Sequence, residues 1–265
     1  MIAAALILIS RLLILTGEDQ HHDWQRTTPV LKSMLEQDGR FEVDVLSDLS
    51  QMAKVDFDAY AAVIIHFKND NPDVPGRVAF ERLNQYVRGG GGLVSVHFGC
   101  GAFEEFEDEY RDLLGRSWFG LPAPTGRRQH DRYGFFEVAP TMERHAITEG
   151  LAPFTTSDEL YTCLTGDGPV KVLAEALSPV DSKKYPMAMV HRPGQGRVFL
   201  STLGHNVDAY QAAGVGGLYR RGAAWAAGIE PVMDQSYVGT GSDQYDVVWT
   251  TPSADASGSM PLGNG

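Results

Sequence analysis

The chain has 265 residues, enough for one large α/β domain or two smaller ones. Its hydrophobic content of 43% and charged content of 21% are typical of a soluble globular protein. The net charge of −12 argues against nucleic acid or an anionic membrane as a partner, because phosphate binding needs clustered lysine and arginine. The two cysteines, Cys100 and Cys163, give no disulfide framework and fit a reducing, cytoplasmic compartment.

The two ends of the chain differ in composition from its middle. Residues 2–9 are apolar, but no basic residue precedes them, and Arg11 interrupts the run well short of a membrane span. We therefore expect residues 1–10 to be an N-terminal extension ahead of one α/β domain at 11–232, with a weak signal peptide as the alternative. Residues 233–265 are rich in glycine, serine, aspartate and threonine, which predicts a poorly ordered tail.

Apolar runs alternate with helical patterns along most of the domain. The runs predict buried strands at residues 12–16, 60–67, 93–97 and 197–203. Residues 41–46 alternate apolar and polar side chains, as an edge strand does. Apolar spacing predicts helices at residues 27–35, 78–87, 103–114 and 217–227. This alternation predicts a flavodoxin-like α/β fold, an open parallel sheet with right-handed crossovers and helices on both faces.

The middle of the chain is less regular. Further strands are predicted at residues 135–138, 170–176 and 187–191, with a turn at 183–186. A loop rich in proline, glycine and basic residues covers 122–131, and a connection carries Asp158-Glu159-Leu160-Tyr161.

A histidine lies at the end of each predicted buried strand or within a few residues beyond it. These histidines are His21 and His22, His66, His97 and His205. Because the carboxyl ends of parallel strands meet at one edge of a sheet, we expect the imidazoles to converge on a crevice there. His97 also ends the strand at the position that the nucleophile takes in a strand–turn–helix elbow. His130 is expected to be exposed, and His145 and His191 to be structural.

Three kinds of chemistry suit such a histidine cluster. Imidazoles can hold a divalent transition metal, act as general acid and base, or hydrogen-bond to sugar hydroxyls. The candidate metal ligands are His22, His66, His97 and His205. Candidate carboxylates are Asp19, Asp23, Asp158 and Glu159, but none forms a recognised metal spacing. The residues themselves leave the choice between these chemistries open, and they suggest no cofactor other than a metal ion.

A serine or cysteine nucleophile is disfavoured. Cys100 lies three residues beyond His97 and is expected to be a small buried residue at the start of a helix. Ser95 lies within the predicted strand and not at its exposed end, where a nucleophile is placed. Nucleotide binding is also disfavoured, because the glycine run at 89–92 precedes its strand whereas phosphate-binding glycines follow one.

Several short motifs follow one another along residues 12–228. They are His21-His22-Asp23-Trp24, Gly-Gly-Gly-Leu-Val-Ser-Val-His97, the stretch 145–151, Asp158-Glu159-Leu160-Tyr161, and the stretch from Gly196 to His205. In these motifs and their order, the chain resembles the trehalose-utilisation (ThuA-like) family, whose fold is related to class I glutamine amidotransferases without their catalytic cysteine. It departs from the family's more usual Gly-Leu-His-Ala-Ala, which is Ser95-Val96-His97-Phe98-Gly99 here, with a larger residue at Phe98 and a glycine after it.

The resemblance implies a role in sugar utilisation and a small-molecule sugar as partner. The expected activity is that of a hydrolase or lyase acting on a disaccharide or a 3-keto-glycoside, and not that of a glutamine amidotransferase. The expected catalytic residues are His97, His205 and Glu159, and the expected substrate-binding residues are His22, Trp24, Asp19, Tyr161 and Phe98. The alternatives are a non-catalytic sugar-binding or regulatory domain and a hydrolase that uses Cys100. A homo-oligomer is compatible with each of them.

Overall fold

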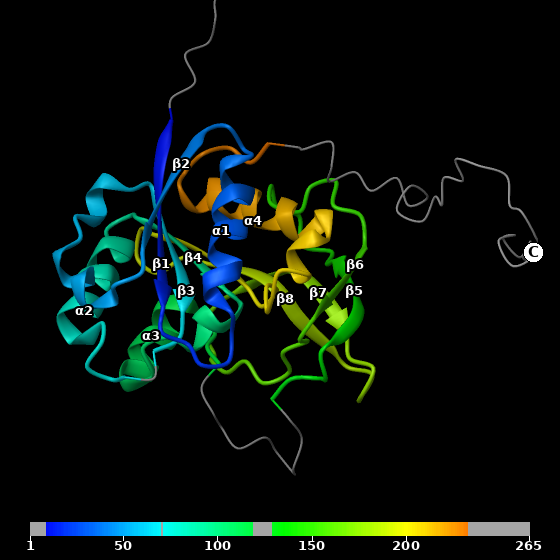
Figure 1. Ribbon diagram of the computed structural model, residues 1–265. Helices are drawn as coiled ribbons and strands as arrows, with labels where there is room; N and C mark the ends of the chain where they lie inside the picture. The colour runs from blue at the N-terminus through cyan, green and yellow to red at the C-terminus, as the bar shows by residue number, and fades with distance from the viewer. Residues whose placement is uncertain (1–8, 70, 119–128, 233–265) are drawn as a thin grey trace, which may run out of the picture.

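A nine-stranded sheet forms the centre of the fold (Figure 1). The computed structural model describes residues 9–69, 71–118 and 129–232. The predicted tail, most of the N-terminal extension and most of the 122–131 loop therefore lie outside the described residues. From one edge to the other, the strands are β2 (Phe41–Leu46), β1 (Ser10–Gly17), β3 (Ala62–Phe67), β4 (Gly92–Val96), β9 (Arg197–Ser201), β8 (Lys184–His191), β7 (Lys171–Leu177), β5 (Gly134–Pro140) and β6 (Phe154–Asp158).

The first five strands in this order are parallel. The register places Thr16 of β1 beside His66 of β3, and Val96 of β4 beside Ser201 of β9. The carboxyl ends of β1, β3, β4 and β9 therefore lie along one edge of the sheet. The predicted flavodoxin-like arrangement, with the strand at 41–46 outside the first, is confirmed.

The other four strands extend the sheet in antiparallel fashion, which the sequence did not predict. Only short connections join β7 to β8 and β8 to β9, whereas a parallel neighbour needs a long crossover, usually a helix. The turn predicted at 183–186 is wrong, because Lys184 and Pro186 pair with β7. Strand β6 was not predicted because its sequence, Phe-Thr-Thr-Ser-Asp, is mostly polar.

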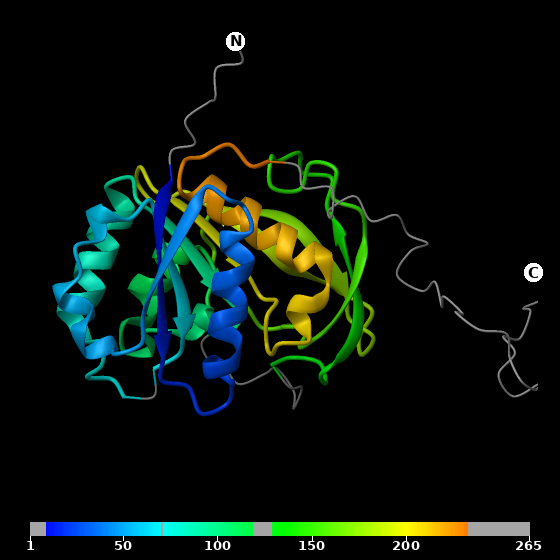
Figure 2. The same cartoon turned by 45° about the horizontal axis from the view of Figure 1, so that its top comes forward.

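Helices cover both faces of the sheet, as predicted (Figures 1 and 2). On one face, α1 (Trp24–Glu36) and α4 (Ala213–Ala226) share a core with Leu12 and Ile14 of β1. On the other, α2 (Gly76–Arg88) and α3 (Glu107–Leu114) share a core with Leu13 and Leu15. Alternate side chains of one strand therefore serve opposite cores. No helix among the described residues is long and apolar enough to cross a membrane.

Three helices begin earlier than their apolar spacing predicts, and the structure gives a reason for α1 and α4. Helix α1 begins at Trp24 because the Asp23 carboxylate accepts a hydrogen bond from the Arg26 N–H and caps it. Helix α4 begins at Ala213, although glycines in this first turn disfavour a helix. A Cβ atom at Gly214 would lie 2.2 Å from the Phe154 ring of β6. Close packing against β6 thus outweighs intrinsic propensity at this end of the helix.

Candidate functional site

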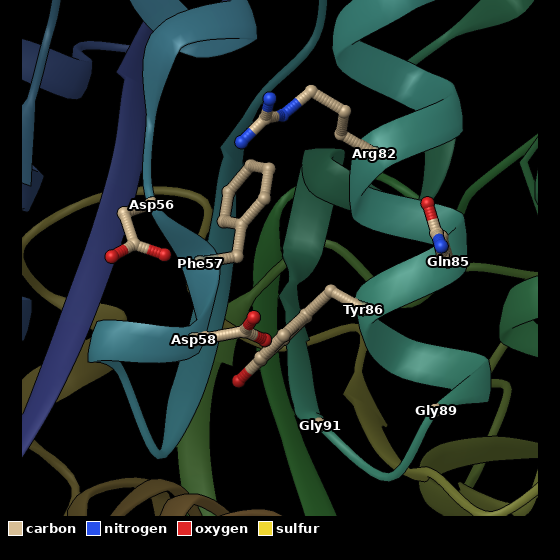
Figure 3. Close-up of a pocket in the computed structure, with 8 residues that line it drawn as sticks. All are labelled: Asp56, Phe57, Asp58, Arg82, Gln85, Tyr86, Gly89 and Gly91. Atoms are coloured by element: carbon tan, nitrogen blue, oxygen red, sulfur yellow. The ribbon is translucent and has the colours of Figure 1, made fainter.

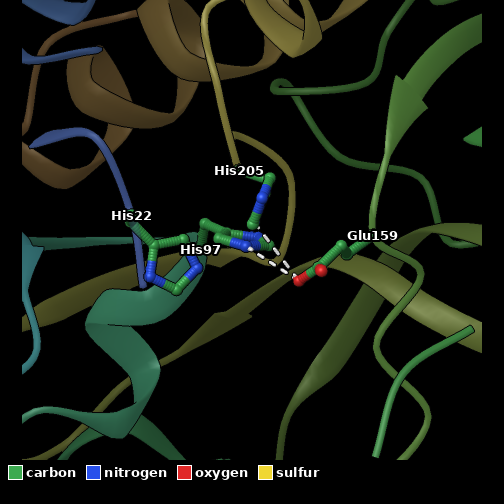
Figure 4. A group of neighbouring side chains, drawn as sticks. All are labelled: His22, His97, Glu159 and His205. Carbon is green, nitrogen blue, oxygen red and sulfur yellow. Dashed lines mark ion pairs between the residues drawn. The ribbon is translucent and has the colours of Figure 1, made fainter. Parts of the chain in front are cut away.

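Three histidines and one glutamate converge at the carboxyl edge of the sheet (Figure 4). His22 follows β1, His97 follows β4, His205 follows β9 and Glu159 follows β6. One potential ligand atom from each side chain lies within 4.8 Å of the other three. The strand ends thus bring three of the sequence-predicted histidines together, and the antiparallel half of the sheet adds the carboxylate.

His97 is fully buried at a sharp turn between β4 and a 3-10 turn at His97–Gly101. Its φ of +42° is uncommon for a residue with a side chain, and such backbone strain clusters at functional sites. The turn also brings residue 99 against β3, where a Cβ at Gly99 would lie 2.3 Å from the Ile65 carbonyl oxygen. The glycine that departs from the usual family pattern is therefore required by this close approach.

Hydrogen bonds fix the tautomer of His97. Its Nδ1 lies 2.6 Å from the Thr202 carbonyl oxygen, which can only accept, so Nδ1 carries the proton. Nε2 therefore presents a lone pair, and the Tyr161 hydroxyl donates to it over 3.1 Å. Burial, reinforced by neighbouring His22 and His205, holds the pKa of His97 well below its usual range. The imidazole is accordingly neutral at pH 7.

His22 is oriented by Asp19 and Phe98. The Asp19 carboxylate lies 3.0 Å from His22 Nδ1 and also accepts the backbone N–H of His22. Although burial favours the protonated form of Asp19, these contacts lower its pKa overall. Phe98 stacks on His22 with ring centroids 4.3 Å apart and planes inclined by 15°. Together they direct His22 Nε2 into the cluster.

Glu159 contacts two of the imidazoles. Its Oε2 lies 3.3 Å from His205 Nδ1 and 3.9 Å from His97 Nε2 (Figure 4). Burial opposes ionisation of Glu159, but His205 and the other histidines lower its pKa overall. Burial likewise opposes the charge on His205, yet Glu159 and two aspartates raise its pKa overall. The site therefore holds an ionised carboxylate beside an imidazole that accepts a proton more readily than usual.

Asp158 joins the two halves of the sheet at this edge. Its buried carboxylate accepts the backbone N–H groups of Gly204 at 2.7 Å, His205 at 3.1 Å and Glu159 at 2.8 Å. Burial raises the pKa of Asp158 to about 7, while the three N–H donors favour its ionised form. Asp158, one of the candidate carboxylates, thus fixes the backbone of Glu159 and His205 and is not itself in the cluster.

His66 does not join the cluster, contrary to its place among the predicted ligands. It lies within β3 and not beyond its end, and it is fully buried. Its Nδ1 lies 3.1 Å from the Thr16 hydroxyl and 3.2 Å from that of Thr28, while its Nε2 lies 3.3 Å from the Thr27 hydroxyl. Both ring nitrogens are therefore engaged, and Glu159 takes the fourth position instead.

The residues expected to bind sugar mostly support the histidines. Phe98 is 1% exposed and Tyr161 is 3% exposed, so both lie behind the imidazoles that they contact. Asp19 holds His22 in the same way. Trp24 is half-buried at the start of α1, and within the described part of the chain no ring contact joins it to the cluster.

Two aromatic residues near the site were not predicted. His130 was expected to be exposed, but its Nδ1 lies 3.6 Å from Glu159 Oε1 and its backbone forms a bridge with Tyr161. Tyr133 is 39% exposed, its ring lies 5.6 Å from that of His205, and its hydroxyl donates to the Ser157 carbonyl oxygen. Both positions depend on pairing between distant segments, which leaves no local signal in the sequence.

Cys100 is expected to resist thiol reagents in the folded protein. It is fully buried, and burial raises the pKa of its thiol far above the usual value. Burial also raises the pKa of the half-buried Cys163 to about 12. We expect iodoacetamide at pH 8 to leave Cys100 unmodified for hours, as measured by mass spectrometry of peptides. The same reagent in urea should label both cysteines, and rapid labelling of native Cys100 would contradict the assignment.

A second concave surface lies at the amino ends of β3 and β4, opposite the carboxyl ends that carry the histidine cluster (Figure 3). It is formed by the segment before β3 and by α2 with the glycine turn after it. Its lining residues are Asp56, Phe57, Asp58, Arg82, Gln85, Tyr86, Gly89 and Gly91. The Tyr86 hydroxyl already donates to the Tyr60 carbonyl oxygen and Arg82 to that of Val55. This surface is separate from the histidine cluster.

The fold and the cluster together define an α/β protein with its polar site at the carboxyl edge of a flavodoxin-like sheet. The sequence pattern of the ThuA family, described as trehalose utilisation, matches residues 11–226. The chain belongs to this family, which confirms the resemblance and connects it with carbohydrate utilisation. No curated protein matches the chain.

Solved structures share the fold. A ThuA-like protein from Parabacteroides merdae is 26% identical, with a TM-score of 0.74 over 85% of this chain and 93% of its own. A cytoplasmic protein from Salmonella typhimurium is 15% identical, with a TM-score of 0.60 over 82% of this chain and 99% of its own. A β-galactosidase from Bacillus circulans, 15% identical, matches 85% of this chain but 32% of its own, with a TM-score of 0.53. At these lower identities the likeness concerns the fold alone.

Proposed function

We propose that this chain is an enzyme that cleaves a disaccharide or its 3-keto form, as a hydrolase or lyase, at the site around His97. Membership of the ThuA family supports a sugar as the substrate class. The observation that carries the proposal is the convergence of His22, His97, His205 and Glu159 within 4.8 Å. Titratable groups with shifted pKa values, gathered at the carboxyl edge of a parallel sheet, favour a catalytic role over passive binding.

The chemistry of a 3-keto sugar fits a site of this composition. The ketone at C3 acidifies the proton on C2, so a base that removes this proton starts elimination. The C2–H electron pair forms a C1–C2 double bond, the anomeric C1–O bond breaks, and the leaving oxygen takes up a proton. In a hydrolase, water then adds across the double bond.

The cluster can support this reaction by two routes. In the first, Glu159 and His205 exchange protons with the sugar themselves; the raised pKa of His205 makes it a stronger base, and the lowered pKa of Glu159 keeps its carboxylate ionised. In the second, the cluster would hold a metal ion, which would supply stabilisation of negative charge on the sugar, and the groups around it would move the protons. Tyr161, whose hydroxyl contacts His97, and His130, beside Glu159, are the nearest such groups. Neither route needs a covalent nucleophile. This is consistent with the burial of Cys100, which keeps its thiol away from a substrate.

Glucose release from trehalose and from 3-keto-trehalose tests the proposal. We expect the full-length protein and its Cys100→Ala variant to release glucose from at least one of the two sugars, and His97→Asn to release none. Tight sugar binding without turnover by the wild type would instead favour a binding or regulatory domain. Loss of activity in Cys100→Ala with activity retained in His97→Asn would favour the cysteine nucleophile.

A further inference from the structure

We propose that the cluster binds one divalent ion of a first-row transition metal. The donor atoms are His22 Nε2, His97 Nε2, His205 Nδ1 and Glu159 Oε2. Imidazole nitrogens suit zinc, cobalt, iron and nickel, whereas magnesium and calcium prefer sites made of oxygen atoms. This inference deepens the proposed function. The action of the ion on a sugar rests on the proposed function, whereas the binding of the ion does not.

Two of the donor atoms lack a hydrogen-bond partner. His22 Nε2 and His205 Nδ1 are both buried, and neither is hydrogen-bonded to any described residue. The Glu159 oxygen at 3.3 Å from His205 Nδ1 is near enough for an ion pair but lacks hydrogen-bond geometry. The His22 side chain is only 9% exposed, so water has little access to its nitrogen. A buried nitrogen without a partner is costly, and a bound ion removes that cost.

The outer nitrogens of two histidines are already fixed. Asp19 accepts from His22 Nδ1, and the Thr202 carbonyl oxygen accepts from His97 Nδ1. Metal-binding histidines almost always donate their second N–H to a carboxylate or a backbone carbonyl, which sets the tautomer and the direction of the ring. In both residues the lone pair of Nε2 is thereby directed into the cluster.

The three rings surround a common point. Their centroids are 5.0 Å apart for His22 and His97, 4.8 Å for His22 and His205, and 5.4 Å for His97 and His205. The planes of each pair meet at 70° to 79°, so the rings approach edge-on and do not stack. Ligand atoms in a tetrahedral zinc site lie roughly 3.3 Å apart. The four ligand atoms already lie within 4.8 Å of one another, so small side-chain rotations suffice to bring them to the spacing of a zinc site.

The charges of the site balance a divalent cation. Glu159 contributes one carboxylate to the cluster, and a second carboxylate, that of Asp19, lies directly behind His22. Among the described residues, neither carboxylate pairs with a lysine or arginine; their ion-pair partners are histidines. The two negative charges are thus not neutralised by a fixed cation.

The Tyr161 hydroxyl competes with the ion for one of the four ligand atoms. It donates to His97 Nε2, the lone pair that the ion would use. Ion binding therefore requires this hydroxyl to turn away from His97, which frees it to hydrogen-bond elsewhere in the site. A bound ion of this class would polarise a sugar oxygen as a Lewis acid.

Titration of the full-length protein with zinc and cobalt tests the inference. After treatment with a chelator and dialysis, we expect one equivalent of zinc to bind, as measured by calorimetry and by elemental analysis of the dialysed complex. Loss of a ligand in His22→Ala or His205→Ala should weaken zinc binding more than about 100-fold, and loss of an orienting group in Asp19→Asn about 10- to 100-fold. Tyr161→Phe removes the competing hydroxyl and should bind zinc at least as tightly as wild type.

His145→Ala serves as the matched control, because His145 contacts Trp225 and is not part of the cluster. It should bind zinc as the wild type does. Absence of a stoichiometric site, or unchanged zinc affinity in folded His22→Ala and His205→Ala, would overturn the inference. Because the titration contains no sugar, that result leaves the glucose-release test standing. Conversely, zinc binding without cleavage of either sugar would support the metal site and contradict the proposed function.

Discussion

Replacing Glu159 with glutamine is expected to lower the rate of sugar turnover about 1,000-fold. Glutamine keeps the size of the side chain but removes the negative charge that lies between His97 and His205. Both routes to the reaction need that charge, either to accept a proton or to hold a cation. Steady-state measurement of glucose release gives the change in kcat directly.

The control for this experiment is Glu42→Gln, which makes the same chemical change at an exposed position of β2. It should leave turnover within a factor of about two, because an isolated surface charge contributes little. Circular dichroism and thermal unfolding of Glu159→Gln should resemble those of the wild type. If a folded Glu159→Gln protein retains turnover within about tenfold of the wild type, Glu159 is not part of the catalytic site.

His66 is expected to make the protein less stable as the pH falls below about 6.5. Burial lowers the pKa of folded His66 to about 3; the neighbouring His22 acts in the same direction, and Asp19 opposes it. Between these pH values the unfolded chain binds more protons than the folded chain, so acid shifts the equilibrium toward unfolding. At about 1.4 kcal/mol per pH unit, His66 alone removes about 3 kcal/mol of the free energy of unfolding between pH 7 and pH 4.

Urea unfolding of the wild type and His66→Gln across this pH range measures the effect. Glutamine can still hydrogen-bond to the threonine hydroxyls but does not titrate. The variant should therefore lose less stability than the wild type on acidification, whatever its stability at pH 7. Equal losses in the two proteins would show that His66 does not remain neutral in the folded state.

The parallel half of the fold could be predicted from sequence, and all four cluster residues were among the expected site residues: the three histidines from the strand pattern, and Glu159 as a candidate carboxylate of the Asp158-Glu159-Leu160-Tyr161 motif. Buried parallel strands appear as short apolar runs, and the residues just after each run must lie at the carboxyl edge. The positions of His22, His97 and His205 are predicted by that rule alone. The same rule misplaced His66, because the strand continues to Phe67 and the imidazole points to a face of the sheet.

The rest of the site depends on contacts between segments far apart in the chain. Glu159 reaches the cluster because Asp158 binds backbone groups of residues 204 and 205, which lie 46 and 47 positions away. The tautomer of His97 is set by a backbone carbonyl, an acceptor that every residue type provides. No pattern of residue types encodes these contacts, so sequence periodicity could not reveal them.

The position of β9 has a consequence for how the chain folds during synthesis. Among the described residues it is the last strand in sequence, yet it lies between β4 and β8 in the middle of the sheet. Until β9 has left the ribosome, nothing can pair with the facing edges of β4 and β8, and such unpaired edges can bind other chains. Completion of the sheet and delivery of His205 to the cluster therefore occur together, late in synthesis, and the protein cannot acquire its site before its two halves are joined.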